Sequence, residues 1–324
     1  MTNESSGQHL PRTTPNASRI QRASKVNIAS PQSILLDTSK ESTSHQNHAP
    51  DTCKVGIFVL QLTDLDYQHL SFNTDFWMWF VTTSDSLSPL STVTVSNAKE
   101  FMMSQQSIER KAGLTWSAQE CKATINKTWQ IENFPFDHQR LHIILEDAQK
   151  DTQSLVYLAD TAESKISKKL VLDGWRINNM TVRSVVQQYE TNYGDPMLHN
   201  GSAYPSIEAT IELHRDGFGL FLKMFIGVYV AFLISIAAFF FNSGADARFS
   251  LAVGALFAAV ANKYIADSYL PTTVQFTLVD KIHALTFIFI LLTIFISVFE
   301  MLHARKEGRV SIGPSKNNPK IEYR

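Results

Sequence analysis

The chain lacks the features that mark an enzyme or a nucleic-acid-binding protein. Its 324 residues include two cysteines, Cys53 and Cys121, whose spacing matches no metal-binding motif. The net charge is -1 and there is no basic stripe, which argues against nucleic acid as a partner. The patterns G-x-S-x-G, H-E-x-x-H, the phosphate loop and the dinucleotide fingerprint are all missing. We therefore expect no enzymatic activity and no cofactor.

Cysteine and histidine spacing leaves two points open. One disulfide could join Cys53 and Cys121, but two separate thiols are favoured, and cysteine usage does not fix the redox compartment. His138 and His142 share one face of a strand-patterned segment. A metal ion would need further ligands, so we expect a structural pair of histidines and no metal site.

The N-terminal part of the chain is polar and without periodicity. The first fifty residues are rich in Ser, Thr, Asn and Gln and poor in large apolar side chains. Such a segment cannot bury enough apolar surface to offset its ordering entropy, so we expect residues 1–52 to form a disordered tail. No apolar stretch typical of a secretory signal follows the start, so export would need another signal or a different start of the gene.

Residues 53–215 have the pattern of a β-sandwich. In the segment 71–80, apolar side chains alternate with others, which places Phe72, Phe76, Met78 and Phe80 on one face of a strand. Short apolar runs at 55–60, 141–145 and 207–213 continue the pattern, with turn residues between them. Many short strands without a long helical pattern predict two packed sheets.

Residues 216–303 have the composition of a helical transmembrane domain with three spans. The segments 224–241 and 282–299 contain no Asp, Glu, Lys or Arg, and the one histidine in the second segment is counted as neutral. As a helix, each segment nearly spans a bilayer core of about 30 Å. The segment 249–262, extended by the more polar 263–268, suits a helix shielded by its neighbours and wet on one side. The alternative is a short re-entrant or core helix. No fourth apolar run follows.

Residues 304–324 form a basic tail. Its cationic residues are Arg305, Lys306, Arg309, Lys316, Lys320 and Arg324. The positive-inside rule places this end in the cytoplasm, and three spans then place the sandwich outside. We expect a multi-pass integral protein of the plasma (inner) membrane, with the lipid bilayer as a partner.

One motif connects these two halves. Residues 133–139 read Asn-Phe-Pro-Phe-Asp-His-Gln within the strand-patterned region, and Leu270-Pro271 closes the second apolar segment. With these residues in this order, the chain resembles the pentameric ligand-gated ion channels, the Cys-loop receptor superfamily, over about residues 53–303. Lys127 and Leu141 stand where the family's flanking cysteines would lie, so the likeness is to prokaryotic-like subunits without that disulfide.

The resemblance implies roles for particular residues. The residues implied to couple the two domains are Phe134, Pro135, Phe136, Asp137, Arg215 and Pro271. Candidate walls of a ligand pocket between sandwiches are Trp79, Tyr157, Tyr189, Tyr193 and Tyr204. An aromatic box of this kind would hold an ammonium group by cation–π attraction. For each aromatic residue, ordinary packing is the competing interpretation.

The second apolar segment has one face that suits a pore. Spacings of three and four residues place on that face Asp246, Ser250, Gly254, Phe257, Ala261, Tyr264 and Ser268. Asp246 would form a carboxylate ring at the cytoplasmic mouth, and Phe257 a constriction that gates by dewetting. Alternatively, Gly254 and Ala261 permit close helix packing, or a shift by one residue replaces Ala261 with Asn262.

These patterns together predict a homopentameric, cation-selective ligand-gated channel whose agonist, a small molecule or a proton, is not specified, and whose permeant ions are inorganic cations. The missing fourth span keeps an alternative open, namely a non-conducting membrane receptor or a truncated subunit of the same family. A membrane-anchored enzyme is disfavoured because catalytic motifs are lacking.

Overall fold

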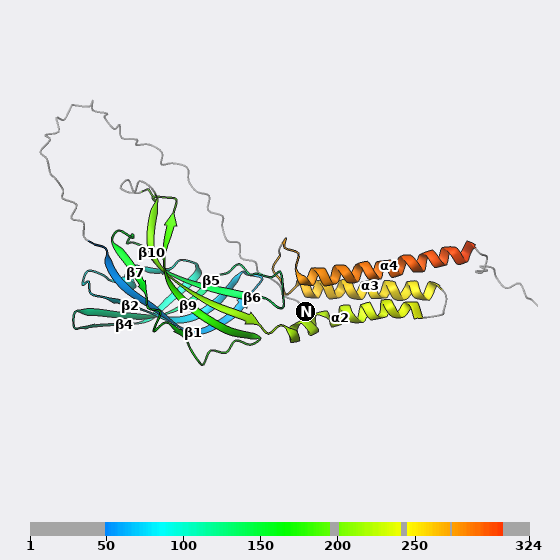
Figure 1. Cartoon of the computed structure of the whole chain (residues 1–324), viewed down its shortest axis with the longest axis horizontal. Helices are drawn as coiled ribbons and strands as arrows, with labels where there is room; N and C mark the ends of the chain where they lie inside the picture. The colour runs from blue at the N-terminus through cyan, green and yellow to red at the C-terminus, as the bar shows by residue number, and fades with distance from the viewer. Residues whose placement is uncertain (1–48, 195–200, 241–244, 273, 307–324) are drawn as a thin grey trace, which may run out of the picture. The chain divides into compact units, whose positions relative to one another are not determined.

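A computed structural model describes residues 49–194, 201–240, 245–272 and 274–306, with the β-strands first and three long helices after them (Figure 1). Most of the expected disordered tail and basic tail, residues 1–48 and 307–324, lies outside these ranges. Asp51 and Thr52, expected in the first tail, instead begin strand β1, because they pair with β7 at Leu155 and Val156.

The strands form two sheets. The first has the order β4 (Ala98–Lys111), β5 (Leu114–Asn126), β2 (Ser71–Thr82), β1 (Asp51–Asp66) and β7 (Leu155–Ala159), and β8 (Lys165–Ile166) also pairs with β1. The second has the order β3 (Val93–Val95), β6 (His138–Asp147), β10 (Ser202–Arg215) and β9 (Trp175–Tyr189). A short helix, α1 (Pro89–Thr92), precedes β3. β7 and β8 run parallel to β1, and the remaining pairs are antiparallel.

Alternating side chains build the core, as the sequence predicts. The four side chains expected on one face of β2 (Phe72, Phe76, Met78 and Phe80) are fully buried. They belong to one apolar cluster with Ile143 and Leu145 of β6, in the other sheet. A period of two therefore sends one face of each sheet inward, and the predicted sandwich is confirmed.

The two cysteines lie in this sandwich as separate thiols. Cys53 is on β1 and Cys121 on β5, and both are buried and free. Burial raises the pKa of each thiol to about 12, so both are neutral at physiological pH. The favoured interpretation, two unpaired cysteines, holds.

Three long helices follow the sandwich. They are α2 (Phe218–Ala237, continued by the 3₁₀ turn η1, Ala238–Phe240), α3 (Ala245–Asp267) and α4 (Leu278–Lys306), and each is long and apolar enough to cross a membrane. The 23 residues of α3 extend about 34 Å, so the short re-entrant alternative is wrong. Figure 1 shows the three helices side by side.

Small residues let α3 pack closely between its neighbours. The buried side of α3 is made of alanines: Ala252, Ala255, Ala259 and Ala266. Side chains this small allow helix backbones to approach each other, which stabilises helix pairs in lipid. α2 and α4 are joined in addition by a buried hydrogen bond of 3.0 Å between Ser235 Oγ and Thr293 Oγ1.

Candidate functional site

A buried ion pair lies where the sheets give way to the helices. Arg215, the last residue of β10, donates from Nε to Asp137 Oδ1 at 2.7 Å. The Asp137 side chain is 2% exposed and that of Arg215 12%. Tyr67 Oη and Gln139 Nε2 each donate to Asp137 Oδ2 at 2.7 Å. The carboxylate is thus compensated by a cation and two further donors, as a buried charge must be.

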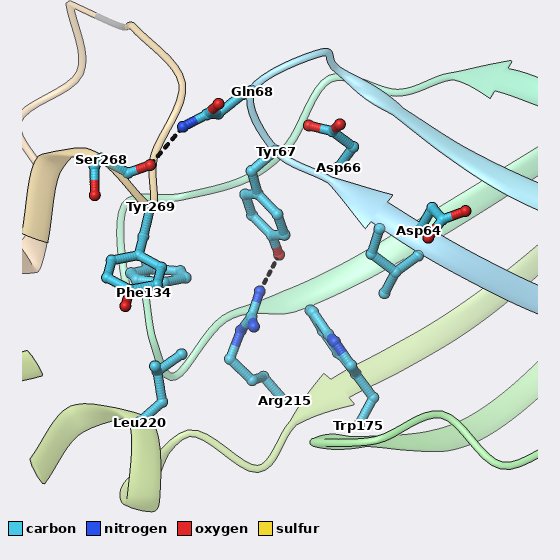
Figure 2. A pocket seen from close by; sticks show the side chains of 11 residues that line it. Asp64, Asp66, Tyr67, Gln68, Phe134, Trp175, Arg215, Leu220, Ser268 and Tyr269 are labelled. Atoms are coloured by element: carbon cyan, nitrogen blue, oxygen red, sulfur yellow. Dashed lines mark hydrogen bonds between the residues drawn. The ribbon is translucent and has the colours of Figure 1, made fainter. Parts of the chain in front are cut away.

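Aromatic rings surround the arginine of this pair. The Arg215 guanidinium carbon lies 4.0 Å from the Trp175 ring centre, 4.9 Å from Phe134 and 5.0 Å from Tyr67. Figure 2 shows Arg215 between Tyr67 and Trp175, with the Tyr67 hydroxyl as a direct partner. Burial, followed by the Asp137 charge, raises the pKa of Tyr67, so its hydroxyl keeps its proton.

The loop that contains Asp137 contacts the first helix. The Phe136 ring centre lies 5.3 Å from that of Phe221 in α2. Gly217, just before α2, fits closely against this loop, because an added Cβ would lie 1.8 Å from the Pro135 carbonyl oxygen. Glycine is therefore required for the close approach.

The segment between α3 and α4 also reaches the sandwich. Leu278 N donates to the Glu132 carbonyl at 2.8 Å, and the Gln68 amide donates to the Ser268 carbonyl (Figure 2). Pro271 lies within this segment. Five of the six predicted coupling residues (Phe134, Pro135, Phe136, Asp137 and Arg215) thus meet at one junction, and the sixth lies in a segment that borders it.

A cavity of about 450 Å³ opens at this junction (Figure 2). Its lining comes from the β1–β2 turn, the loop, the ends of β9 and β10, α2 and the start of the α3–α4 segment. Sequence reasoning missed Tyr67 and Gln68 here, and it assigned no role to Gln139, although Gln139 ends the 133–139 motif. No local pattern marks Tyr67 or Gln68, because their partners lie on other elements.

The face of α3 predicted to line a pore is exposed in the single chain. All seven residues are exposed, with Phe257 at 71% and Tyr264 at 81%, although Ser268 lies in the turn just after α3 ends at Asp267. The side chain of Asn262 instead reaches α2 and α4, where it bonds to the Met224 carbonyl and to His283. Arg248 forms an ion pair with Glu300 of α4, while Asp246 lies in the first turn of α3.

A second candidate site is a cluster of three tyrosines at the end of the β9–β10 hairpin. Ring centres lie 5.9 Å apart for Tyr189 and Tyr193, 6.0 Å for Tyr189 and Tyr204, and 6.5 Å for Tyr193 and Tyr204, all in edge contact. Tyr193 has φ +52° and is followed by Gly194 at φ +82°, both in the left-handed region that is typical of turns. Residues 195–200 lie outside the described residues.

Two carboxylates, Glu146 and Asp147, line a cavity together with two of these tyrosines. A cavity of about 350 Å³ is lined by Tyr193 and Tyr204 together with Thr94, Glu146, Asp147 and Ala148. Tyr189 Oη donates to both oxygens of Glu146 at 2.9 Å. Burial raises the pKa of Glu146 against the opposing effect of the Tyr189 hydrogen bond, and it raises the pKa of Tyr189 to about 12.

Glu146 and Asp147 differ in their capacity for a further partner. Asp147 accepts hydrogen bonds from Thr92 at 2.6 Å and Tyr157 at 3.1 Å, and also from two backbone amides. Its acceptor sites are therefore occupied by the fold. Glu146, which sequence reasoning missed, accepts side-chain hydrogen bonds from Tyr189 and Ser96, so fewer of its acceptor sites are occupied than those of Asp147.

The other two predicted pocket residues lie elsewhere. Tyr157 is buried in the core against Phe80, with its ring centre 5.9 Å away, because it shares the inward face of β7 with Leu155. Its hydroxyl reaches Asp147 from behind the cavity. Trp79 lies on the first sheet, above Gly56, and its indole N–H donates to Asp160 at 3.2 Å. Neither residue joins the tyrosine cluster within one chain.

His138 and His142, which the sequence analysis treats as a structural pair, each contact a different residue. The His138 ring lies 4.2 Å from that of His214, and His142 Nδ1 lies 2.6 Å from Glu208 Oε1. Within the described ranges, no group of three or more His, Cys, Asp or Glu side chains is placed to hold a metal ion.

Comparison with known proteins gives one distant likeness. The chain is 23% identical over 209 residues to a proton-gated ion channel of Gloeobacter violaceus (strain ATCC 29082 / PCC 7421). The match covers 64% of this chain and 54% of the bacterial protein, so the chain spans about half the length of that relative. No family model matches the chain. That relative is an ion channel and not an enzyme, and the likeness, together with three helices able to cross a membrane, supports an integral membrane protein.

Proposed function

We propose that the chain is a subunit of a homopentameric ligand-gated ion channel in which α3 lines a cation-conducting pore. The observation that carries the proposal is the division of α3 into two sides. One side is alanine-rich and packs on α2 and α4, whereas the seven residues predicted for a pore are all exposed in the single chain. A helix with Asp246 and Ser250 exposed suits water better than lipid.

A single α3 helix cannot enclose a water-filled pore, so the exposed face of α3 would need the same helix from further subunits around one axis. A closed ring satisfies every copy equally and leaves no unpaired interface. A ring of five copies would place five Phe257 side chains around one axis, narrow enough to gate by dewetting. Asp246 would then supply a ring of carboxylates at one mouth, which attracts cations and repels anions.

Ligand binding belongs to the tyrosine cluster. Three aromatic rings and the Glu146 carboxylate attract positive charge, the first by cation–π interaction and the second directly. We expect an agonist with a cationic group, or a proton taken up by Glu146, whose pKa is raised. Trp79 would complete the pocket from a neighbouring subunit, since it lies on the other sheet of its own chain.

The junction at Asp137 and Arg215 would transmit binding to the pore. The loop around Asp137 touches α2, and its neighbour Glu132 holds the start of α4. Movement of the sandwich would therefore act on the connection between α3 and α4. Such coupling links two distinct sites through two states of the whole molecule. The sandwich would lie outside the plasma (inner) membrane and the C-terminus in the cytoplasm.

Current through a planar bilayer tests the proposal. Purified protein should give cation-selective currents that respond to pH or to an organic ammonium ion. A ring of chains that never conducts, even with Phe257→Ser at the constriction, would favour the second candidate, a non-conducting membrane receptor or a truncated subunit of this family.

A further inference from the structure

Two histidines lie side by side across neighbouring strands on the outer face of the second sheet. His138, the first residue of β6, is directly opposite His214 of β10 in the strand register. The next residue inward along each strand, Gln139 or Leu213, is buried, so both histidines point outward. The ring centres are 4.2 Å apart. His138 is exposed and His214 half-buried, so solvent reaches both rings.

A direct hydrogen bond does not lock this pair of rings. His214 Nδ1 lies 3.0 Å from His138 Nδ1 and 3.1 Å from His138 Nε2, so a proton between the rings has no single lone pair to point at. Two N–H groups facing each other would repel, which leaves at least one nitrogen lone pair directed into the gap. The torsion about the histidine Cβ–Cγ bond is soft, so His138 can turn either nitrogen toward a shared partner.

The separation of the nitrogens suits a transition-metal ion. Zn–N bonds are about 2.0–2.1 Å long, and two such bonds at an angle of about 90–109° place their nitrogens about 2.9–3.4 Å apart. Both distances from His214 Nδ1 to the nitrogens of His138 fall in this range. Neutral imidazole is a ligand that Zn²⁺, Cu²⁺ and Ni²⁺ share, whereas Mg²⁺ and Ca²⁺ prefer oxygen.

Pairing between strands supplies what the sequence pattern alone could not. His138 and His142 share one face of β6 but are four residues apart, which is about 13 Å along a strand and too far for one ion. The register of β6 and β10 instead brings His138 to His214, 76 positions away in the chain. His142 has its own carboxylate partner in Glu208.

The charges near the two rings do not exclude a cation. Arg140 and Glu212, the next outward-facing pair on the same two strands, form an ion pair at 3.1 Å. Arg176, opposite His214 on β9, lies 3.6 Å from Asp216. Each arginine therefore has a carboxylate partner, and the four charges sum to zero.

We propose that His138 and His214 form a binding site for one divalent transition-metal ion of the zinc, copper and nickel group, with water in the remaining coordination positions. His138 directly follows Asp137, and His214 directly precedes Arg215. A metal ion bound here fastens the start of β6 to the end of β10 beside the buried ion pair. It stabilises the folded protein, because the unfolded chain does not hold the two rings together. The site does not depend on the proposed channel function.

Calorimetric titration with zinc, on full-length protein in detergent without a polyhistidine tag, tests the site. His138→Gln and His214→Gln should each weaken binding at this site about tenfold or more, since loss even of a residue that only orients a metal ligand costs about 10–100-fold. The double variant should lose no more than either single variant, because two ligands of one ion act as a unit. Mg²⁺ in excess should not displace the zinc.

His142→Gln is the matched control, because His142 lies on the same face of β6 but bonds to Glu208. Its zinc affinity should stay within about twofold of the wild type, as expected of an independent position. Electron paramagnetic resonance of bound Cu²⁺ should in addition report two imidazole nitrogens in the wild type and fewer in each single variant.

Three results would overturn the proposal. The first is zinc binding that is unchanged in His138→Gln and His214→Gln. The second is an equal loss in the control His142→Gln, which would indicate a general effect of surface histidines. The third is a loss in the double variant equal to the sum of the single losses, which would mean two independent histidines.

Discussion

Asp137 and Arg215 are 78 positions apart in the chain, yet their side chains form a 2.7 Å ion pair that is almost fully buried. The pair joins the loop before β6 to the last residue of β10, directly ahead of α2. Low exposure protects it from screening by salt, unlike a surface pair.

Removing one partner of this pair should strongly destabilise the protein. Asp137→Asn or Arg215→Gln leaves an uncompensated buried charge, which costs about 3–5 kcal/mol. Thermal unfolding in detergent should show a large fall in midpoint temperature for both variants. Arg140→Gln is the matched control. Arg140 on β6 pairs with Glu212 on β10 at 3.1 Å, close to the buried pair but in solvent, where such a pair contributes about 0–1 kcal/mol. Equal losses in all three variants would contradict the special role of the buried pair.

Cation binding at the tyrosine cluster should depend on the ionisation of Glu146. Its pKa is raised above the ordinary range of glutamate, chiefly by burial, so the attracting charge is lost as pH falls through that raised value. The affinity for tetramethylammonium, measured by calorimetry, should therefore decrease on acidification. Glu146→Gln should lower the affinity at neutral pH and abolish this pH dependence.

Glu208→Gln serves as the control for that experiment. Glu208 lies on the same sheet, pairs with His142 and Arg183, and is not part of the cavity lining. Its loss should leave the affinity unchanged within about twofold, well under the tenfold that 1.4 kcal/mol represents. An equal effect of both substitutions would mean that the net charge of the sheet, and not Glu146, sets the affinity.

Local sequence patterns predicted the elements of this fold well, and contacts between distant elements less well. The face of β2 and the three helices follow from periodicity and from runs without charge, which are properties of one segment. Glu146 and Tyr67 could not be found in this way, because the register of β6 and the packing of the β1–β2 turn bring them to their partners. Tyr157 was misplaced as a pocket wall for the same reason, since its inward direction depends on the pairing of β7 with β1.

The constriction at Phe257 should become leaky when it is made polar. Phe257→Ser lets water enter a ring that five phenylalanines would keep dry, so resting current in a bilayer should rise. Ile265→Ser is the control, because Ile265 is also exposed but lies about 80° round the helix from Phe257. A larger leak in the control than in Phe257→Ser would show that the pore face of α3 is rotated from the one assigned here.

Ion selectivity should follow the charge of Asp246. Asp246 and Arg248 are two residues apart and point about 200° from each other on a helix, and Arg248 pairs with Glu300 on α4. Reversal potentials in a sodium chloride gradient should lie near the sodium potential and move toward zero in Asp246→Ala. A value near the chloride potential would mean that Arg248, and not Asp246, faces the ions.

The number of chains in the assembly tests the central claim most directly, because one α3 helix cannot enclose a pore and no agonist is needed for the measurement. Native mass spectrometry of the purified protein in detergent should give a complex of about five times the 36.5 kDa chain mass. A stable monomer as the sole species would contradict the pore.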